Sequence, residues 1–251
     1  MHRATLIIAT LVLLLSLGCA LAALASGLGH RWDWWDFRTG FAVLRWSAYS
    51  ALPLIALGVV VAIFAWLRQM WLSLVAALLG VAFCVITVGL PWSYLRLARS
   101  LPPIHDISTD TGDPPEFVSI LSLRADAPNP AVYGGAAIAE QQQRAYADLK
   151  PLRVSLPPQD VLARAVEVGK AMGWEIIAAV PLEGRLEATD TTLWFGFKDD
   201  IVVRITPSDD GSRVDVRSVS RVGRSDIGTN ARRIRTFLKK LDARIGPKWA
   251  R

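Results

Sequence analysis

Three long stretches without a charged residue lie in the first 95 residues, and they restrict the fold more than any other feature. They cover residues 4–25, 46–67 and 69–95. An α-helix rises about 1.5 Å per residue, so about 20 apolar residues cross a hydrocarbon core about 30 Å thick. Each stretch is long enough, and we therefore predict three transmembrane helices in a membrane anchor comprising residues 1–98.

The distribution of tryptophan supports this anchor. Seven of the ten tryptophans lie in the first 95 residues, mostly in the first loop or near the end of a span. At a membrane surface an indole ring can bury its carbons while its N–H stays hydrated. The lipid bilayer is thus the first expected partner, and an integral inner (plasma) membrane location follows.

Charge and cysteine content exclude several classes of function. The net charge is +6, but eight of the basic residues and one acid lie between Gly228 and Arg251, within one expected C-terminal helix. Such a helix is not a nucleic-acid groove with interleaved aromatic residues, so we expect no nucleic-acid partner. Cys19 and Cys84 both lie in apolar stretches, so the rest of the chain can hold neither a disulfide nor a thiolate metal site. We expect no cofactor.

The remaining residues predict one α+β domain in two parts. Residues 99–152 are rich in proline, glycine, aspartate and serine, and are expected to be mostly irregular. Within residues 153–251, a helix from Pro157, four consecutive strands between 174 and 222, and a last helix follow one another. This order predicts a two-layer domain, in which an antiparallel sheet carries both helices on one face and leaves the other face hydrated.

Two rules disagree on the side of the membrane that holds this domain. Met1, His2 and Arg3 before an apolar run are typical of a signal anchor, and three spans that start inside end outside. The positive-inside rule favours the cytoplasm instead, because one side carries more arginines (Arg31, Arg38, Arg45, Arg96 and Arg99) than the other (Arg3 and Arg68).

Four ordered motifs between about residues 102 and 241 resemble a known family. They read PIHDISTD with DPPEF, MGWEI, EATDTT with WFGFKDD, and DVRSVSR, and they begin at residues 103, 172, 187 and 215. Together they resemble the family numbered 1499 among the domains of unknown function, which is found in bacteria and plastids. The resemblance implies no established activity or site. Related chains often look like lipoproteins or thylakoid-lumen proteins, which favours an extracytoplasmic, periplasmic domain here.

One polar cluster has the composition of a cation or acid–base site. It consists of His105, Asp106, Asp110 and Asp113. One imidazole and several carboxylates at short spacing could bind a hard cation or transfer protons. Alternatively, these aspartates cap turns by accepting hydrogen bonds from nearby backbone N–H groups. The cluster contains no thiolate and a single histidine, so we assign no metal to it.

A second set of polar residues lies on or near the last two strands. Asp190 is in a strand, where acids are disfavoured, and it needs a cationic partner if it faces inward. The expected candidate ligand pocket consists of Asp190, Arg217, Ser218, Ser220 and Arg221. The alternative is a structural network of ion pairs and hydrogen bonds that fixes the strand register.

These observations predict a membrane-anchored extracytoplasmic module that binds a partner protein, in the membrane or the periplasm, or a polar ligand at the membrane surface. The chain contains no nucleophile elbow, phosphate-binding glycine loop or dinucleotide fingerprint. An enzyme is therefore not the first expectation. The alternative is a carboxylate-based hydrolase, either metal-dependent or metal-free, that uses Asp106, Asp110 and Asp190.

Overall fold

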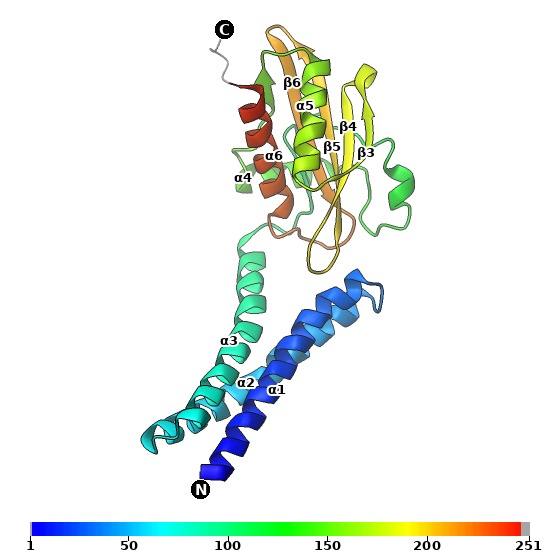
Figure 1. The fold of residues 1–251 in the computed structure, drawn as a ribbon. Coiled ribbons are helices and arrows are strands. Elements are labelled where there is room, and N and C mark those ends of the chain that lie inside the picture. The colour runs from blue at the N-terminus through cyan, green and yellow to red at the C-terminus, as the bar shows by residue number, and fades with distance from the viewer. Residues whose placement is uncertain (1, 247–251) are drawn as a thin grey trace. The chain divides into compact units, whose positions relative to one another are not determined.

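The structure, a computed structural model, describes residues 2–246 (Figure 1). These residues divide into two compact units. The first comprises residues 2–97 together with the short segment 193–196, and the second comprises residues 98–192 and 197–246.

Three long helices form the first unit: α1 (His2–Arg31), α2 (Phe37–Leu67) and α3 (Trp71–Ser100). Each is long and apolar enough to cross a membrane, with a mean hydropathy of 2.6, 2.4 and 2.5 in its most apolar window. The helices extend beyond the charge-free stretches because polar residues continue them; Asp36, for example, caps α2 by accepting hydrogen bonds from the N–H groups of Arg38 and Thr39.

Small residues fill the space between these helices, and large apolar residues point away from it. The side chains of Ala9, Ala65 and Ala77 are fully buried, and the Cys84 thiol donates a hydrogen bond to Ser16 Oγ at 3.1 Å. Most of the exposed leucine, isoleucine and valine side chains of the chain lie on the outer surfaces of α1, α2 and α3. Membrane helices pack in this way, because small residues let backbones approach while lipid solvates the large ones.

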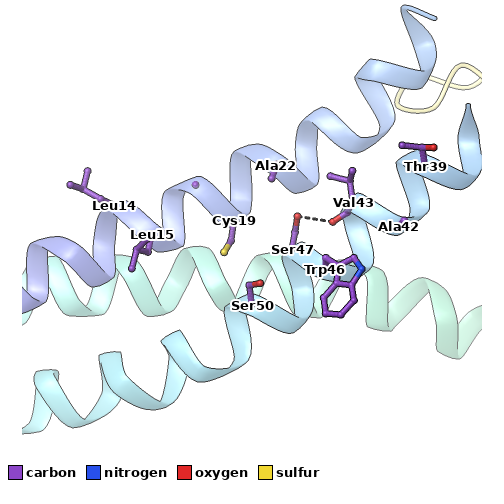
Figure 2. A pocket seen from close by; sticks show the side chains of 11 residues that line it. Leu14, Leu15, Cys19, Ala22, Thr39, Ala42, Val43, Trp46, Ser47 and Ser50 are labelled. Carbon is purple, nitrogen blue, oxygen red and sulfur yellow. Dashed lines mark hydrogen bonds between the residues drawn. The ribbon is translucent and has the colours of Figure 1, made fainter. Parts of the chain in front are cut away.

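An open groove runs between α1 and α2 (Figure 2). Its lining is almost entirely apolar, and the hydroxyl of Ser47 donates back to the Val43 carbonyl within α2 at 2.8 Å. Polar groups along the groove are thus largely satisfied within the helices. This surface suits hydrocarbon chains and selects no particular ligand.

The second unit is built on one antiparallel sheet. Its strands are β1 (Asp106–Ser108), β2 (Leu152–Val154), β3 (Glu175–Val180), β4 (Arg185–Thr191), β5 (Lys198–Ser208) and β6 (Gly211–Ser220). The order is β1-β6-β5-β4-β3, and β2 also pairs with β6, beside β1 along the same edge.

Helices α5 (Pro158–Ala171) and α6 (Thr229–Ile245) cover one face of this sheet (Figure 1). Alternate residues of the central strands point toward them, so that Val203 and Val216 join Ile234 and Phe237 in the main core. The remaining helical elements are α4 (Gly135–Ala145) and the 3-10 turns η1 (Leu121–Arg124) and η2 (Pro181–Glu183). The predicted architecture, three apolar helices followed by an antiparallel sheet with helices on one face, is confirmed.

The other face is not hydrated, which corrects the expectation from strand alternation. The segment 109–134 lies over it, and Phe117 and Ile120 pack there against Val202 and Val219. Alternation correctly separated the two faces of β6, but it could not show that an irregular segment distant in sequence covers the polar one.

Candidate functional site

Asp106, from the polar cluster predicted from the sequence, forms a buried ion pair on the covered face of the sheet. Its two carboxylate oxygens accept hydrogen bonds from Arg217 Nε and Nη2 at 2.9 and 2.7 Å. The Arg217 guanidinium also donates to the Pro115 and Ala131 carbonyls and lies over the ring of Phe117. Both charges are fully engaged, so this pair connects β1, β6 and segment 109–134.

A second member of the predicted polar cluster, Asp110, stabilises a local turn. Asp110 accepts hydrogen bonds from the N–H groups of Gly112 and Asp113, both at 3.0 Å, and pairs with Arg213 at 2.5 Å. Burial opposes ionisation of Asp110, but these hydrogen bonds and the Arg213 charge hold its pKa below the usual value.

The side chains of Asp113 and His105 make other contacts. Asp113 pairs with Arg204 at 2.9 Å, and His105 Nδ1 is 3.5 Å from the Arg224 carbonyl oxygen. Among residues 2–246 no three histidine, cysteine or acidic side chains form a group that could hold a metal ion. Of the four residues, Asp110 caps a turn, whereas Asp106 and Asp113 pair with arginines. A cation-binding or acid–base role for them stays a prediction.

Two further buried acids on the covered face were not named as site residues from the sequence. Glu187 on β4 accepts hydrogen bonds from the backbone N–H groups of Val118, Ser119 and Ile120 at 3.0, 3.0 and 2.8 Å. Asp200 on β5 pairs with Arg124 and Arg221 at 3.0 and 2.8 Å. For Glu187 the signal was an acid between the apolar residues Leu186 and Ala188; Asp200, beside Lys198 and Asp199 at the start of β5, carried no comparable signal.

The sheet separates the five residues of the predicted ligand pocket. Arg217 and Arg221 point to the covered face, whereas Asp190, Ser218 and Ser220 point to the helix face, as the partners of each show. The five residues therefore do not line one pocket. A ligand-binding role for any of them stays a prediction.

Asp190 pairs with an arginine from α6 that the sequence analysis left unassigned. Arg233 Nε donates to Asp190 Oδ2 at 2.7 Å, and Arg233 Nη2 donates to Asp199 at 2.6 Å. Burial opposes the charge of Arg233, but the two carboxylates raise its pKa above the usual value. Arg233 Nη1 also donates to Ser218 Oγ at 3.1 Å, and Asn230 joins Ser220 to this network.

The loop before α6 is strained and held by a buried carboxylate. Ile227 has φ 52°, which a β-branched residue rarely adopts, and Gly228 follows with φ 71°. Asp226 accepts hydrogen bonds from the N–H groups of Gly228 and Asn230 at 3.0 and 2.6 Å. Burial raises the pKa of Asp226, and the nearby Asp199 charge adds to the effect.

A small open pocket of 180 Å³ lies where α6 begins, beside Asp190. Trp174, which is 4% exposed, borders it and stacks on Phe237 with ring centroids 4.9 Å apart. The indole N–H of Trp174 is buried and has no hydrogen-bond partner among the described residues. The pocket is lined by Met172, Trp174, Asp190, Thr229, Arg232, Arg233 and Thr236.

Comparisons with other proteins give one finding for this architecture. Searches of curated proteins and of solved structures find no match. A family model matches residues 106–241, more than half of the chain, and covers every strand of the sheet and most of α6. The predicted resemblance is thereby confirmed, and the chain belongs to the family described as "Protein of unknown function (DUF1499)".

Proposed function

We propose that this protein is a membrane-anchored module whose extracytoplasmic domain binds a small polar ligand in the pocket at the start of α6. One observation carries the proposal: the pocket holds two accessible side chains of opposite charge. The Asp190 carboxylate is 28% exposed there, and the Arg232 guanidinium is exposed and makes no ion pair with a described residue.

The contrast with the other polar residues supports this choice. The acids of the covered face bind arginines or backbone N–H groups, as Asp106, Glu187 and Asp200 do. Asp190 and Arg232, by contrast, are accessible from the pocket, where a ligand can reach both charges.

The alternative hydrolase is less well supported by the same geometry. Its three proposed carboxylates, Asp106, Asp110 and Asp190, each pair with a different arginine. In each of them an arginine donates a hydrogen bond to a carboxylate oxygen, so that oxygen is occupied and less available to take a proton from a substrate. Asp106 and Asp190 also lie on opposite faces of the sheet, so they do not converge on one substrate.

A ligand screen on the full-length protein tests the proposed function. The chain in maltoside micelles is heated with a panel of polar anions, cations, zwitterions and sugars, beside an Arg232→Ala variant. Alanine removes the exposed guanidinium that lines the pocket. We expect at least one compound to raise the melting temperature of the original protein and to act more weakly on the variant. A panel in which no compound distinguishes the two proteins would refute the proposal.

Two arguments support the extracytoplasmic placement: the odd number of predicted spans, and the likeness of related chains to lipoproteins and thylakoid-lumen proteins. A cytoplasmic N-terminus followed by three spans leads outside, whereas the arginine count favours the reverse. Reporter fusions after Arg68 and Arg251 decide between them. An enzyme that works only after export should be active at 251 and inactive at 68; the opposite pattern would place the domain and its ligand in the cytoplasm.

A further inference from the structure

We propose that the loop between β4 and β5 enters the membrane, with the Trp194 indole at the boundary of the hydrocarbon core and the Leu193 side chain in contact with lipid. The loop is then an additional membrane contact beside the three predicted spans. This inference is independent of the α6 pocket, because none of the residues that carry it lines that pocket.

The tip of this loop is apolar, although turns between strands are usually built from polar residues and glycine. Its four residues, 193–196, read LWFG. Two hydrogen bonds of 2.8 Å close its base: the Thr192 N–H donates to the Phe197 carbonyl, and the Phe197 N–H donates to Thr192 Oγ1. The tip is thus a compact projection on which Leu193 is 86% exposed. Apolar surface of this kind is unfavourable in water and marks a contact with lipid or protein.

The hydrogen bonds of the tip indicate its depth. The tip belongs to the first unit, together with the three long helices. The Trp194 indole N–H donates to the Leu24 carbonyl at 2.9 Å, and Arg31 Nη1 donates to the Leu193 carbonyl at 2.8 Å. Leu24 lies next to the end of the first charge-free stretch, and Arg31 ends α1. The tip therefore lies where the hydrocarbon core meets the headgroups, a level at which tryptophan is enriched.

The apolar part of α3 lies at the same level. Trp194 borders an apolar pocket of about 260 Å³, to which α3 contributes Ile86 and Leu90. Both residues belong to the charge-free stretch 69–95, and their side chains are largely exposed. Lipid solvates such side chains when a helix spans a membrane. An indole beside them is therefore at the depth of the outer hydrocarbon rather than in bulk water.

The helices of the first unit hold two of the aromatic residues of the tip. A Cβ atom at Gly27 of α1 would lie 2.4 Å from Trp194 Cδ1 and Nε1, so only glycine leaves room for the indole there. Phe195 is 6% exposed and packs on Phe41 of α2, with ring centroids 4.9 Å apart. Trp194 and Phe195 are thus fixed against the helices, and Leu193 remains on the outside.

Lipid is the partner that this arrangement favours for Leu193. The residue adjoins Trp194, which is bonded to Leu24, and the Leu24 side chain is itself 53% exposed on the apolar surface of α1. The exposed surface of the tip is therefore continuous with the surface that the spans present to the bilayer. Water and a partner protein are the alternatives, and the experiment separates all three.

Spin-label accessibility in phosphatidylcholine nanodiscs tests the inference. Leu193→Cys or Leu182→Cys is introduced into the full-length protein without its two cysteines (Cys19→Ser and Cys84→Ser), and the new thiol receives a nitroxide. Oxygen concentrates in lipid and a nickel chelate stays in water, so the ratio of their collision rates with the label reports its surroundings. Leu182 is the matched control, because it is a 97% exposed leucine in the turn before β4, whereas Leu193 lies in the turn after β4.

We expect the ratio of oxygen to nickel collisions to be at least fivefold higher at position 193 than at position 182. Equal ratios, with the nickel chelate reaching both labels, would place the tip in water and overturn the inference. A label at position 193 that neither reagent reaches would show that protein covers the tip, and this result would overturn it as well.

Two glycine variants test how the tip is held. Gly27→Ala places a Cβ atom in the space of the Trp194 indole, so it should displace the tip and lower the ratio at position 193 at least twofold. Gly18→Ala is the matched control on the same helix, because nothing lies within 4 Å of the added Cβ atom, and it should leave the ratio unchanged. Equal ratios in the two variants would show that the indole contact does not position the tip, and would overturn that part of the inference.

Discussion

Asp106 and Arg217 form a two-point ion pair on the covered face of the sheet, with side-chain exposures of 6% and 2% and hydrogen bonds of 2.9 and 2.7 Å. The pair lies where β1 meets β6, and Arg217 also reaches the carbonyls of Pro115 and Ala131. Asp106, which the sequence analysis gave as a candidate acid–base or cation-binding residue, thus holds segment 109–134 in place through Arg217.

Replacing Asp106 should therefore unfold the domain rather than change a ligand response. Asp106→Ala leaves Arg217 buried without its counterion, and we expect the free energy of unfolding to fall by about 3–5 kcal/mol. Urea unfolding of the full-length protein in micelles measures it. Asp113→Ala is the control: that side chain is 81% exposed, so its pair with Arg204 should contribute less than about 1 kcal/mol. Equal effects of the two changes would contradict this assignment.

Glu187 should control the order of segment 109–134 specifically. Glu187→Gln removes the charge and one of the two carboxylate oxygens that accept the N–H groups of residues 118–120, so hydrogen exchange at Ile120 should become at least tenfold faster. The amide of Val203 in the sheet interior should change less. Glu183→Gln is the matched control, because Glu183 also pairs with Arg185 but is largely exposed. Unchanged exchange at Ile120 would show that packing alone holds the segment.

The two acids that pair with Arg233, Asp190 and Asp199, should contribute unequally to the free energy of unfolding. Asp199 is buried and Asp190 is partly exposed at the pocket. We expect Asp199→Asn to lower the free energy of unfolding by about 3 kcal/mol, and Asp190→Asn by about 1 kcal/mol, because solvent screens the latter pair. Thermal unfolding of both variants compares them. A larger loss for Asp190→Asn would mark that residue as structural and weaken its assignment to the ligand.

Asp226 should make stability depend on pH. Burial raises its pKa in the folded protein above the unfolded value of about 3.9, so its carboxyl binds a proton more tightly when folded. Its favourable contribution is then fully present below about pH 3.9 and is lost as the pH rises through the folded pKa. Asp226→Asn does not titrate, so its stability relative to the original protein should increase between pH 3 and pH 7. A difference that is constant or falls with pH would contradict the raised pKa.

The sequence predicted the long, periodic elements well and the short ones poorly. The three spans, β3 to β6, α5 and α6 each carry several apolar residues at a clear period. By contrast, β1 and β2 have three residues each, too few for alternation to appear, and they form only because β6 offers them a free edge. Their strand character is a product of tertiary structure.

The candidate site, too, could be predicted only in part, because its side-chain pairings depend on tertiary structure. Asp190 was expected to need an arginine, and it has one, but from α6 rather than from β6. Arg233 lies one turn before Phe237 and is therefore on the buried stripe of α6, a helical spacing that the basic character of the neighbouring residues obscured. Trp174 could not be identified from sequence, because an unpaired N–H is a property of the packed structure alone.

The pairing of β1 with β6 has a consequence for how the protein is made. Asp106 emerges soon after the third span, whereas Val219, its partner, is synthesised more than a hundred residues later. Contacts of such long sequence separation form slowly, because the intervening loop must close first. The sheet therefore cannot be completed on the ribosome until nearly all of the chain has been translated. We therefore expect β1 and β2, although they are made first, to join the sheet only when β6 has been synthesised.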